Sequence, residues 1–164
     1  MNLVKDYKQY FTPERLAEYM VSIIPDNTIS SIVDLSMGEC GLLEEAKKRW
    51  KNAELFGADI DNDLIKKINK RSPYIKTYQG DSLSDKLDLW KAYRNIINKS
   101  GFDLAIANPP FNFFEQKVVE IDKGEQMTLP IEMRFLVKYI DIVREKGYIC
   151  IILPYGFLSL DLYR

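Results

Sequence analysis

The chain has 164 residues, of which 46% are hydrophobic and 29% are charged, a composition that suits one globular domain with a real core. It contains no histidine and only two cysteines, Cys40 and Cys150, which excludes histidine-activated nucleophiles, histidine metal sites and a disulfide framework, and indicates a reducing, cytoplasmic setting. The net charge of −1 offers no overall excess of basic residues to neutralise phosphates.

Along the chain, helical patterns alternate with short apolar runs. Thr12 is expected to cap a first helix over residues 13–24, with Pro13 at its first position. Further helices are predicted at 42–50, 62–70, 85–98 and 129–146. Strands are predicted at 31–35, 55–58, 75–78, 102–107 and 148–153, whereas residues 112–128 are expected to be irregular. The alternation predicts one α/β domain over residues 1–164, with a mostly parallel sheet covered by helices on both faces.

In such a sheet, ligands bind beyond the carboxyl ends of the strands, so the segments that follow strands are candidate sites. The sequence Asn108-Pro109-Pro110-Phe111 directly follows the predicted strand at 102–107. Its two prolines stiffen the loop and remove two backbone donors, so that carbonyl and amide oxygens remain as acceptors, and Phe111 offers a flat ring for stacking. This pattern suits a planar group that carries an NH2, and a plain Pro-Pro turn is the alternative.

Two further segments are candidates for holding a cofactor. Residues 34–41 follow the first strand, and their glycines permit a tight turn close to a ligand, although an ordinary turn explains them equally well. Asp59 ends the second strand, roughly 20 residues further on, where Rossmann-like sheets place the acid that holds a ribose. Asp61 or Asn62 is the better candidate cap for the following helix, which leaves Asp59 for the ligand.

Taken in order, these segments resemble the gamma-class N6-adenine DNA methyltransferases, including the modification subunits of restriction systems. Asn108 to Phe111 matches their catalytic loop. The other matching segments are Tyr10-Phe11-Thr12-Pro13, the glycine loop Asp34 to Gly41, the ribose motif Gly57 to Asp61, the adenine-contacting Gly80-Asp81-Ser82-Leu83, and Gly147 to Pro154 with Phe157-Leu158. Cys40 departs from the pattern, because the family usually has glycine there. The resemblance implies a Rossmann-like methyltransferase fold whose last strands and target-recognition region are missing from this sequence.

The resemblance implies S-adenosylmethionine as cofactor, no metal, and the N6 amino group of DNA adenine as methyl acceptor. In the cofactor site, Asp59 would bind the ribose hydroxyls, Asp81 would accept from the adenine amino group, and Ile60 and Leu83 would pack on its faces. Thr12 would hold the methionine end near Gly38. The full implied cofactor set is Thr12, Asp34, Gly38, Gly41, Asp59, Ile60, Asp81 and Leu83.

In the implied catalytic loop, Asn108 and the Pro109 carbonyl would accept hydrogen bonds from the target amino group, once the base has left the duplex. This draws the nitrogen lone pair toward the sulfonium methyl, while Phe111 stacks on the base and Pro110 keeps the loop stiff. Catalysis would then depend on positioning and electrostatic complementarity, with no covalent enzyme intermediate.

The implied partners are DNA, through a region missing here, and a specificity subunit, with no membrane. We therefore expect residues 1–164 to bind S-adenosylmethionine without methylating DNA alone. Two alternatives stay open: a protein glutamine-amide methyltransferase and a non-catalytic S-adenosylmethionine-binding module of a larger assembly. The glutamine enzymes share an Asn-Pro-Pro loop but typically carry Tyr at its fourth position, so Phe111 and the early Tyr10-Phe11-Thr12-Pro13 favour DNA.

Overall fold

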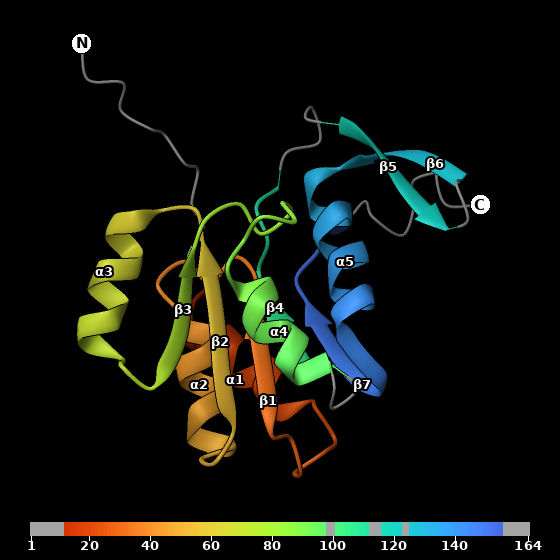
Figure 1. The fold of residues 1–164 in the computed structure, drawn as a ribbon. Helices are drawn as coiled ribbons and strands as arrows, with labels where there is room; N and C mark the ends of the chain where they lie inside the picture. Colours follow the sequence, from red (N-terminus) through yellow and green to blue (C-terminus); the bar gives the residue numbers. More distant parts are fainter. Residues whose placement is uncertain (1–11, 98–100, 112–115, 123–124, 156–164) are drawn as a thin grey trace.

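The computed structural model describes residues 12–97, 101–111, 116–122 and 125–155. Over these residues, the main sheet has five parallel strands in the order β3-β2-β1-β4-β7 (Figure 1). The strands are β1 (Ser31–Asp34), β2 (Glu54–Asp59), β3 (Ile75–Gln79), β4 (Phe102–Ala107) and β7 (Val143–Ile151). Because all five run in one direction, the segments that follow β1, β2, β3 and β4 meet at one edge of the sheet.

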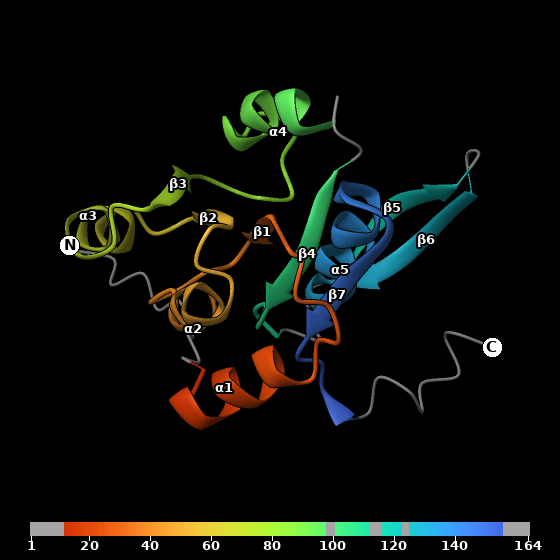
Figure 2. The same ribbon diagram turned by 90° about the horizontal axis from the view of Figure 1, so that it is seen from below.

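Helices cover both faces of the sheet, as Figure 2 shows from below. The helices α1 (Glu14–Ser22), α2 (Gly41–Arg49) and α3 (Asn62–Arg71) pack on one face, and α4 (Leu89–Ile97) and α5 (Ile131–Ile142) pack on the other. The alternation of side chains along a strand divides the core accordingly. In β1, Ile32 packs among α1, α2 and α3, whereas Val33 packs among α4 and α5. The predicted α/β architecture is thus confirmed.

The predicted strands and helices are all present, and they differ from the structure mainly at their ends. The strand β4 has the predicted bounds. The helix α4 begins at Leu89 rather than at residue 85, because residues 81–88 form successive turns. Thr12 is not the cap of α1: the N-cap is Pro13, with no side-chain cap hydrogen bond. Among the described residues, no helix is long and apolar enough to cross a membrane.

The prediction that residues 112–128 are irregular is wrong for the part that the structure describes. β5 (Gln116–Asp122) and β6 (Glu125–Pro130) form an antiparallel pair in which Val118 lies opposite Thr128. This hairpin contacts α5 and lies beside it in Figure 1. The many charged residues of β5 obscured its strand pattern in the sequence, because the hairpin is partly exposed. Since β6 runs to Pro130, α5 begins two residues later than predicted.

The strand β7 begins five residues before the predicted strand, and it forms one edge of the described sheet. Val143 pairs with Phe102, but Tyr148 pairs with Leu104, so the residues between Val143 and Tyr148 bulge out of the ladder. Lys146 has a φ of 61° within this bulge. The early start of β7 also ends α5 at Ile142, four residues before the predicted end.

Candidate functional site

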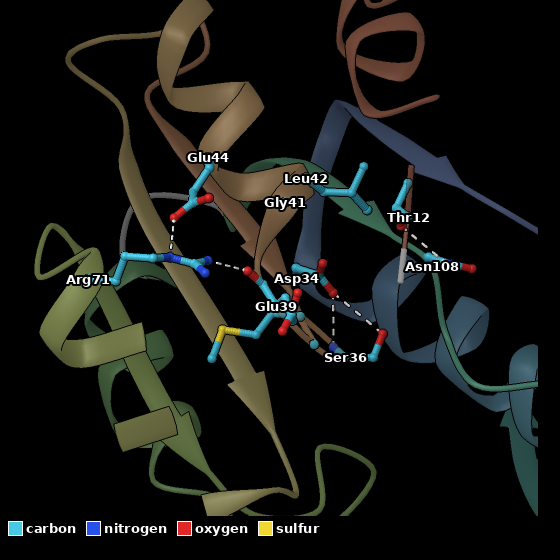
Figure 3. A pocket seen from close by; sticks show the side chains of 11 residues that line it. Thr12, Asp34, Ser36, Glu39, Gly41, Leu42, Glu44, Arg71 and Asn108 are labelled. Atoms are coloured by element: carbon cyan, nitrogen blue, oxygen red, sulfur yellow. Dashed lines mark hydrogen bonds and ion pairs between the residues drawn. The ribbon is translucent and has the colours of Figure 1, made fainter. Parts of the chain in front are cut away.

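A cavity of about 200 Å³ opens at the carboxyl edge of the sheet, between the loops that follow β1 and β4 (Figure 3). Its walls come from the end of β1 and these two loops, from the segment before α1, from the first turn of α2 and from the end of α3. The lining residues are Thr12, Asp34, Ser36, Met37, Gly38, Glu39, Gly41, Leu42, Glu44, Arg71 and Asn108. The structure therefore brings together five of the residues predicted for the cofactor and catalytic sites, namely Thr12, Asp34, Gly38, Gly41 and Asn108.

The loop between β1 and α2 lies directly on β2. Gly38 has a φ of 50°, a left-handed conformation that favours glycine. The Met37 backbone N–H donates to the Ala58 carbonyl oxygen at 3.0 Å. A Cβ atom on Gly57 would collide with the Met37 side chain, so a larger residue there would require this side chain to shift.

The peptide groups of Leu35 are held from two other parts of the chain. The Leu35 N–H donates to the Tyr139 hydroxyl oxygen at 2.8 Å, and the Leu35 carbonyl accepts from the Ser82 hydroxyl at 2.6 Å. Tyr139 and Ser82 are both buried. Neither residue was predicted for the site, although Ser82 lies in the Gly80 to Leu83 motif, and a tyrosine hydroxyl on an apolar helix face requires a partner.

Asp34 is a buried carboxylate in the wall of the cavity. Its Oδ1 accepts from the Ser36 backbone N–H at 2.9 Å, and it also interacts with the Tyr139 hydroxyl. Burial raises the pKa of Asp34 to about 7, although the hydrogen bonds from Ser36 act in the opposite direction. A cationic group placed in the cavity would stabilise the ionised form of Asp34.

Asp59 supports the glycine loop from the end of β2. One of its carboxylate oxygens accepts from the Gly38 N–H at 2.9 Å, and the other accepts from the Asp61 N–H at 2.9 Å. Burial raises the pKa of Asp59. Asp61 caps α3, as predicted, by accepting from the Asp63 and Leu64 N–H groups. Asp59 does not cap α3, but its carboxylate accepts from the Gly38 and Asp61 N–H groups, so its contact with a ligand stays a prediction.

Four predicted cofactor residues, Asp59, Ile60, Asp81 and Leu83, lie at the same edge of the sheet but do not line the cavity. The Gly80 N–H donates to the Asp59 carbonyl at 2.9 Å, which joins the ends of β2 and β3. Ile60 is 49% exposed, and Asp81 is exposed with its Oδ1 accepting from the Leu83 N–H at 2.9 Å. Asp59 is buried and Leu83 is half-buried, so Ile60 and Asp81 form the open surface beside the cavity.

The loop after β4 carries Asn108 into the cavity. The Asn108 Nδ2 donates to the Thr12 Oγ1 at 3.2 Å, as Figure 3 shows. Pro109 is buried, Phe111 is half-buried and Pro110 is exposed. The predicted motif residues Tyr10, Phe11, Phe157 and Leu158 lie outside the described residues.

Arg71 is the cationic side chain in the described cavity wall, and it was not predicted from the sequence. It lies at the end of α3 and reaches across to Glu39, Cys40 and Glu44. No spacing in the sequence indicates this contact, because Arg71 and Cys40 are 31 residues apart. Among the described residues, no group of three or more Asp, Glu or Cys side chains is arranged to hold a metal ion.

Comparisons with known proteins show the family and the fold. The model of the N-6 DNA Methylase family matches residues 2–161. A modification subunit assigned to a type I restriction enzyme from Vibrio vulnificus is 18% identical, with a TM-score of 0.66 over 93% of this chain and 36% of that chain. A methyltransferase subunit of a type I restriction-modification system from Streptococcus thermophilus is also 18% identical, with a TM-score of 0.64 over 90% of this chain and 35% of that chain.

The same fold occurs in methyltransferases of other substrates. A precorrin-6y C5,15-methyltransferase from Geobacter metallireducens is 11% identical, with a TM-score of 0.56 over 93% of this chain and 69% of that chain. At such identities the likeness shows the Rossmann-like methyltransferase fold alone. The chain spans about a third of the length of the two restriction-modification subunits. No curated protein sequence matches the chain significantly.

Proposed function

The chain belongs to the N-6 DNA methylase family, and we propose that it supplies the cofactor-binding and catalytic part of an enzyme that methylates the N6 amino group of adenine in DNA. The observation that carries this proposal is the position of Asn108. Asn108, the first residue of the Asn-Pro-Pro-Phe loop, lines the same cavity as Asp34 and the glycine loop. A methyl donor bound at the glycine loop would therefore lie beside a target amine bound at Asn108.

The lining of the cavity fits the methionine end of S-adenosylmethionine, which carries an ammonium group and a carboxylate. When bound, this cofactor supplies an electrophilic methyl group on a sulfonium. The buried Asp34 would bind the ammonium group, and the backbone of Gly38 and Gly41 would approach the methionine chain. Thr12 would lie at the same end of the cavity.

The open surface beside the cavity fits the adenosine end of the cofactor. Asp59 accepts backbone hydrogen bonds from Gly38 and Asp61 on different carboxylate oxygens, and its remaining acceptor capacity would serve a ribose hydroxyl. Ile60 exposes an apolar surface on which the adenine ring would pack, with Leu83 on its other face. Asp81 would accept from the adenine amino group.

The target amine would be bound by acceptors of the loop after β4. Asn108 Oδ1 and the Pro109 carbonyl oxygen would accept hydrogen bonds from its two N–H groups, which directs the nitrogen lone pair toward the methyl group. The half-buried ring of Phe111 would stack on the flipped base. The chain's contribution to the rate is then mainly the positioning of the two reactants.

DNA and a specificity subunit are the proposed partners. The two structures from type I restriction systems are more than twice as long as this chain, and they are subunits of larger systems. The net charge of −1 also favours DNA binding through another region or another subunit. The glutamine-amide and non-catalytic alternatives are outcomes of the test below.

The proposal is tested in two steps. Calorimetric titration of the purified chain with S-adenosylmethionine should show binding, with S-adenosylhomocysteine as a comparison ligand. Cells without adenine methylation are then made to express the chain together with the genes that flank its own. Mass spectrometry of the digested DNA should detect N6-methyladenine, and the Asn108→Ala variant should not produce it. Methylation of protein glutamine in the same cells, or cofactor binding with no N6-methyladenine in their DNA, would overturn the proposal.

A further inference from the structure

The turn that joins the glycine loop to α2 contains a cysteine in a glycine-like conformation. Cys40 has φ 59° and ψ 21°, it is the N-cap of α2, and its side chain makes no cap hydrogen bond. Residues other than glycine are uncommon in this left-handed region, because the Cβ atom crowds the backbone. The Cys40 side chain is also fully buried, so other parts of the fold must accommodate it.

One side chain from α3 contacts three successive parts of this turn. The Arg71 Nη2 donates to the Glu39 carbonyl oxygen and to the Cys40 Sγ, the latter at 3.3 Å. The Arg71 Nε donates to Glu44 Oε1 at 3.1 Å, in the first turn of α2 (Figure 3). Arg71 therefore binds the residue before Cys40, Cys40 itself and the helix that follows it.

Neighbouring groups help to hold Arg71, Cys40 and Glu44 in this arrangement. The Ser72 hydroxyl donates to the same Glu44 oxygen, which holds the carboxylate in place. Burial raises the pKa of the Cys40 thiol to about 12, and the nearby Glu44 carboxylate acts in the same direction. The sulfur is therefore a neutral acceptor for the guanidinium, and the planar fork of arginine suits several acceptors at once.

We propose that Arg71 is a positioning residue for the cofactor site, which fixes the left-handed turn at Cys40 and thereby the backbone of Gly38 to Gly41. The inference rests on the proposed function, because the cavity that this backbone lines is the proposed site for the methionine end of S-adenosylmethionine. Glycine at position 40 would adopt the left-handed conformation readily, because it has no side chain that must be accommodated. We therefore expect the turn to depend on Arg71 only when residue 40 is cysteine.

The test is a double-mutant cycle with Arg71→Met, Cys40→Gly and the double variant. Each protein is titrated with S-adenosylmethionine, and the hydrogen exchange of amides 38–44 is measured without cofactor. In the protein that has Cys40, Arg71→Met should weaken cofactor binding by roughly tenfold and speed the hydrogen exchange. In the Cys40→Gly protein, the same substitution should change binding and exchange by less than about twofold. A coupling of this size is typical of contacting residues.

Two control variants separate geometry from charge. Lys67→Met removes the neighbouring ion pair of α3 with the Glu39 carboxylate, 2.9 Å long, but leaves the contacts of Arg71 intact, so binding and exchange should stay close to wild type. Arg71→Lys keeps the positive charge but lacks the planar guanidinium with its several N–H donors, so it should behave like Arg71→Met. Thermal unfolding of each variant confirms that it is folded before it is titrated.

The outcomes distinguish this inference from the proposed function. Equal effects of Arg71→Met in the wild-type and Cys40→Gly proteins would overturn the positioning role, and so would weaker binding with unchanged exchange, which would indicate direct contact with the cofactor. If the wild-type chain binds no S-adenosylmethionine, the proposed function fails, and the exchange measurements still decide whether Arg71 fixes the turn.

Discussion

The Asn108 amide nitrogen donates to the Thr12 hydroxyl oxygen at 3.2 Å, across 96 residues of sequence. The bond joins the loop after β4 to the segment before α1, so that Asn108 and Thr12 lie side by side in the cavity wall. Because the amide NH2 faces Thr12, the bond also determines where the amide carbonyl oxygen lies. Thr12 was predicted as a helix cap and a cofactor contact, and the structure gives it a direct bond to the proposed catalytic residue.

Thr12→Val should lower kcat more than it changes the affinity for S-adenosylmethionine. Valine keeps the shape of threonine but cannot accept the hydrogen bond, so the Asn108 amide loses its fixed orientation. We expect a roughly tenfold decrease in kcat, which corresponds to the loss of about one hydrogen bond. Steady-state kinetics of DNA methylation by the chain with its partners give kcat. Thr12→Ser should restore most of the lost kcat. An unchanged kcat in Thr12→Val would show that the bond does not matter for catalysis.

Asn108→Ala should abolish methyl transfer and leave cofactor binding nearly intact. In the proposed mechanism Asn108 accepts from the target amine, and the loss of one preorganised polar group typically costs roughly 100- to 1000-fold in rate. Calorimetry measures cofactor binding, and the DNA assay measures transfer. If the variant keeps its rate, the catalytic role of Asn108 is wrong, whatever its cofactor affinity.

Binding of S-adenosylmethionine should depend on the ionisation of Asp34. Burial raises the pKa of Asp34 to about 7, so the free chain holds a proton there below that pH, whereas an ammonium ligand requires the carboxylate. Affinity should therefore rise by roughly tenfold between pH 6 and pH 7.5 and level off above. Titrations across this range test the slope, and Asp34→Asn should bind weakly with a flat profile. An equally steep profile in Asp34→Asn would assign the dependence to another group.

Asp59→Ala should weaken S-adenosylmethionine binding by about 1.5–3 kcal/mol, the cost of losing hydrogen bonds to a charged group. It should also lower thermal stability, because the Gly38 and Asp61 N–H groups lose their acceptor. Asp61→Ala is the matched control: it removes the cap of α3, at a cost of about 1 kcal/mol in stability, without removing a proposed ligand contact. Equal affinities of the Asp59→Ala and Asp61→Ala proteins would place the ribose elsewhere.

Asp103 should stabilise the fold at neutral pH and cease to do so in acid. Burial alone would raise the pKa of Asp103, but hydrogen bonds from Ser30, Arg144 and Ser31 outweigh it and lower the pKa to about 2. An acid whose pKa is lowered by folding stabilises above its unfolded pKa of about 4, and the contribution disappears as the pH falls toward 2.

Asp103→Asn should accordingly reduce the free energy of unfolding by roughly 1–2 kcal/mol at pH 7, after allowance for solvent screening. Urea unfolding at pH 7 and pH 3 measures the difference, which should narrow at the lower pH. Asp63→Asn serves as a surface control, since its ion pair with Lys66 is exposed. A difference that stays constant with pH would show that charge is not the cause.

The sequence predicted the main sheet because its strands are short apolar runs between amphipathic helices, a pattern that each segment carries locally. It did not predict the β5–β6 hairpin, whose charged strands depend on contact with α5. The acid and amide positions of the site followed from their places after strands. The residues that hold the glycine loop in place, such as Ser82, Tyr139 and Arg71, could not be predicted in this way. They contact the loop only after the chain has folded.

The two hydrogen bonds at Leu35 also lead us to expect an order of events during folding. Ser82 lies 47 residues beyond Leu35, and Tyr139 lies 104 residues beyond it. Contacts so distant in sequence form late, because closing long loops costs chain entropy before the contact is gained. The loop after β1 is therefore complete only when α5 has docked, and a partly synthesised chain that ends before α5 has no finished site. In a refolding experiment, S-adenosylmethionine binding should appear together with the burial of Tyr139, as the last step rather than the first.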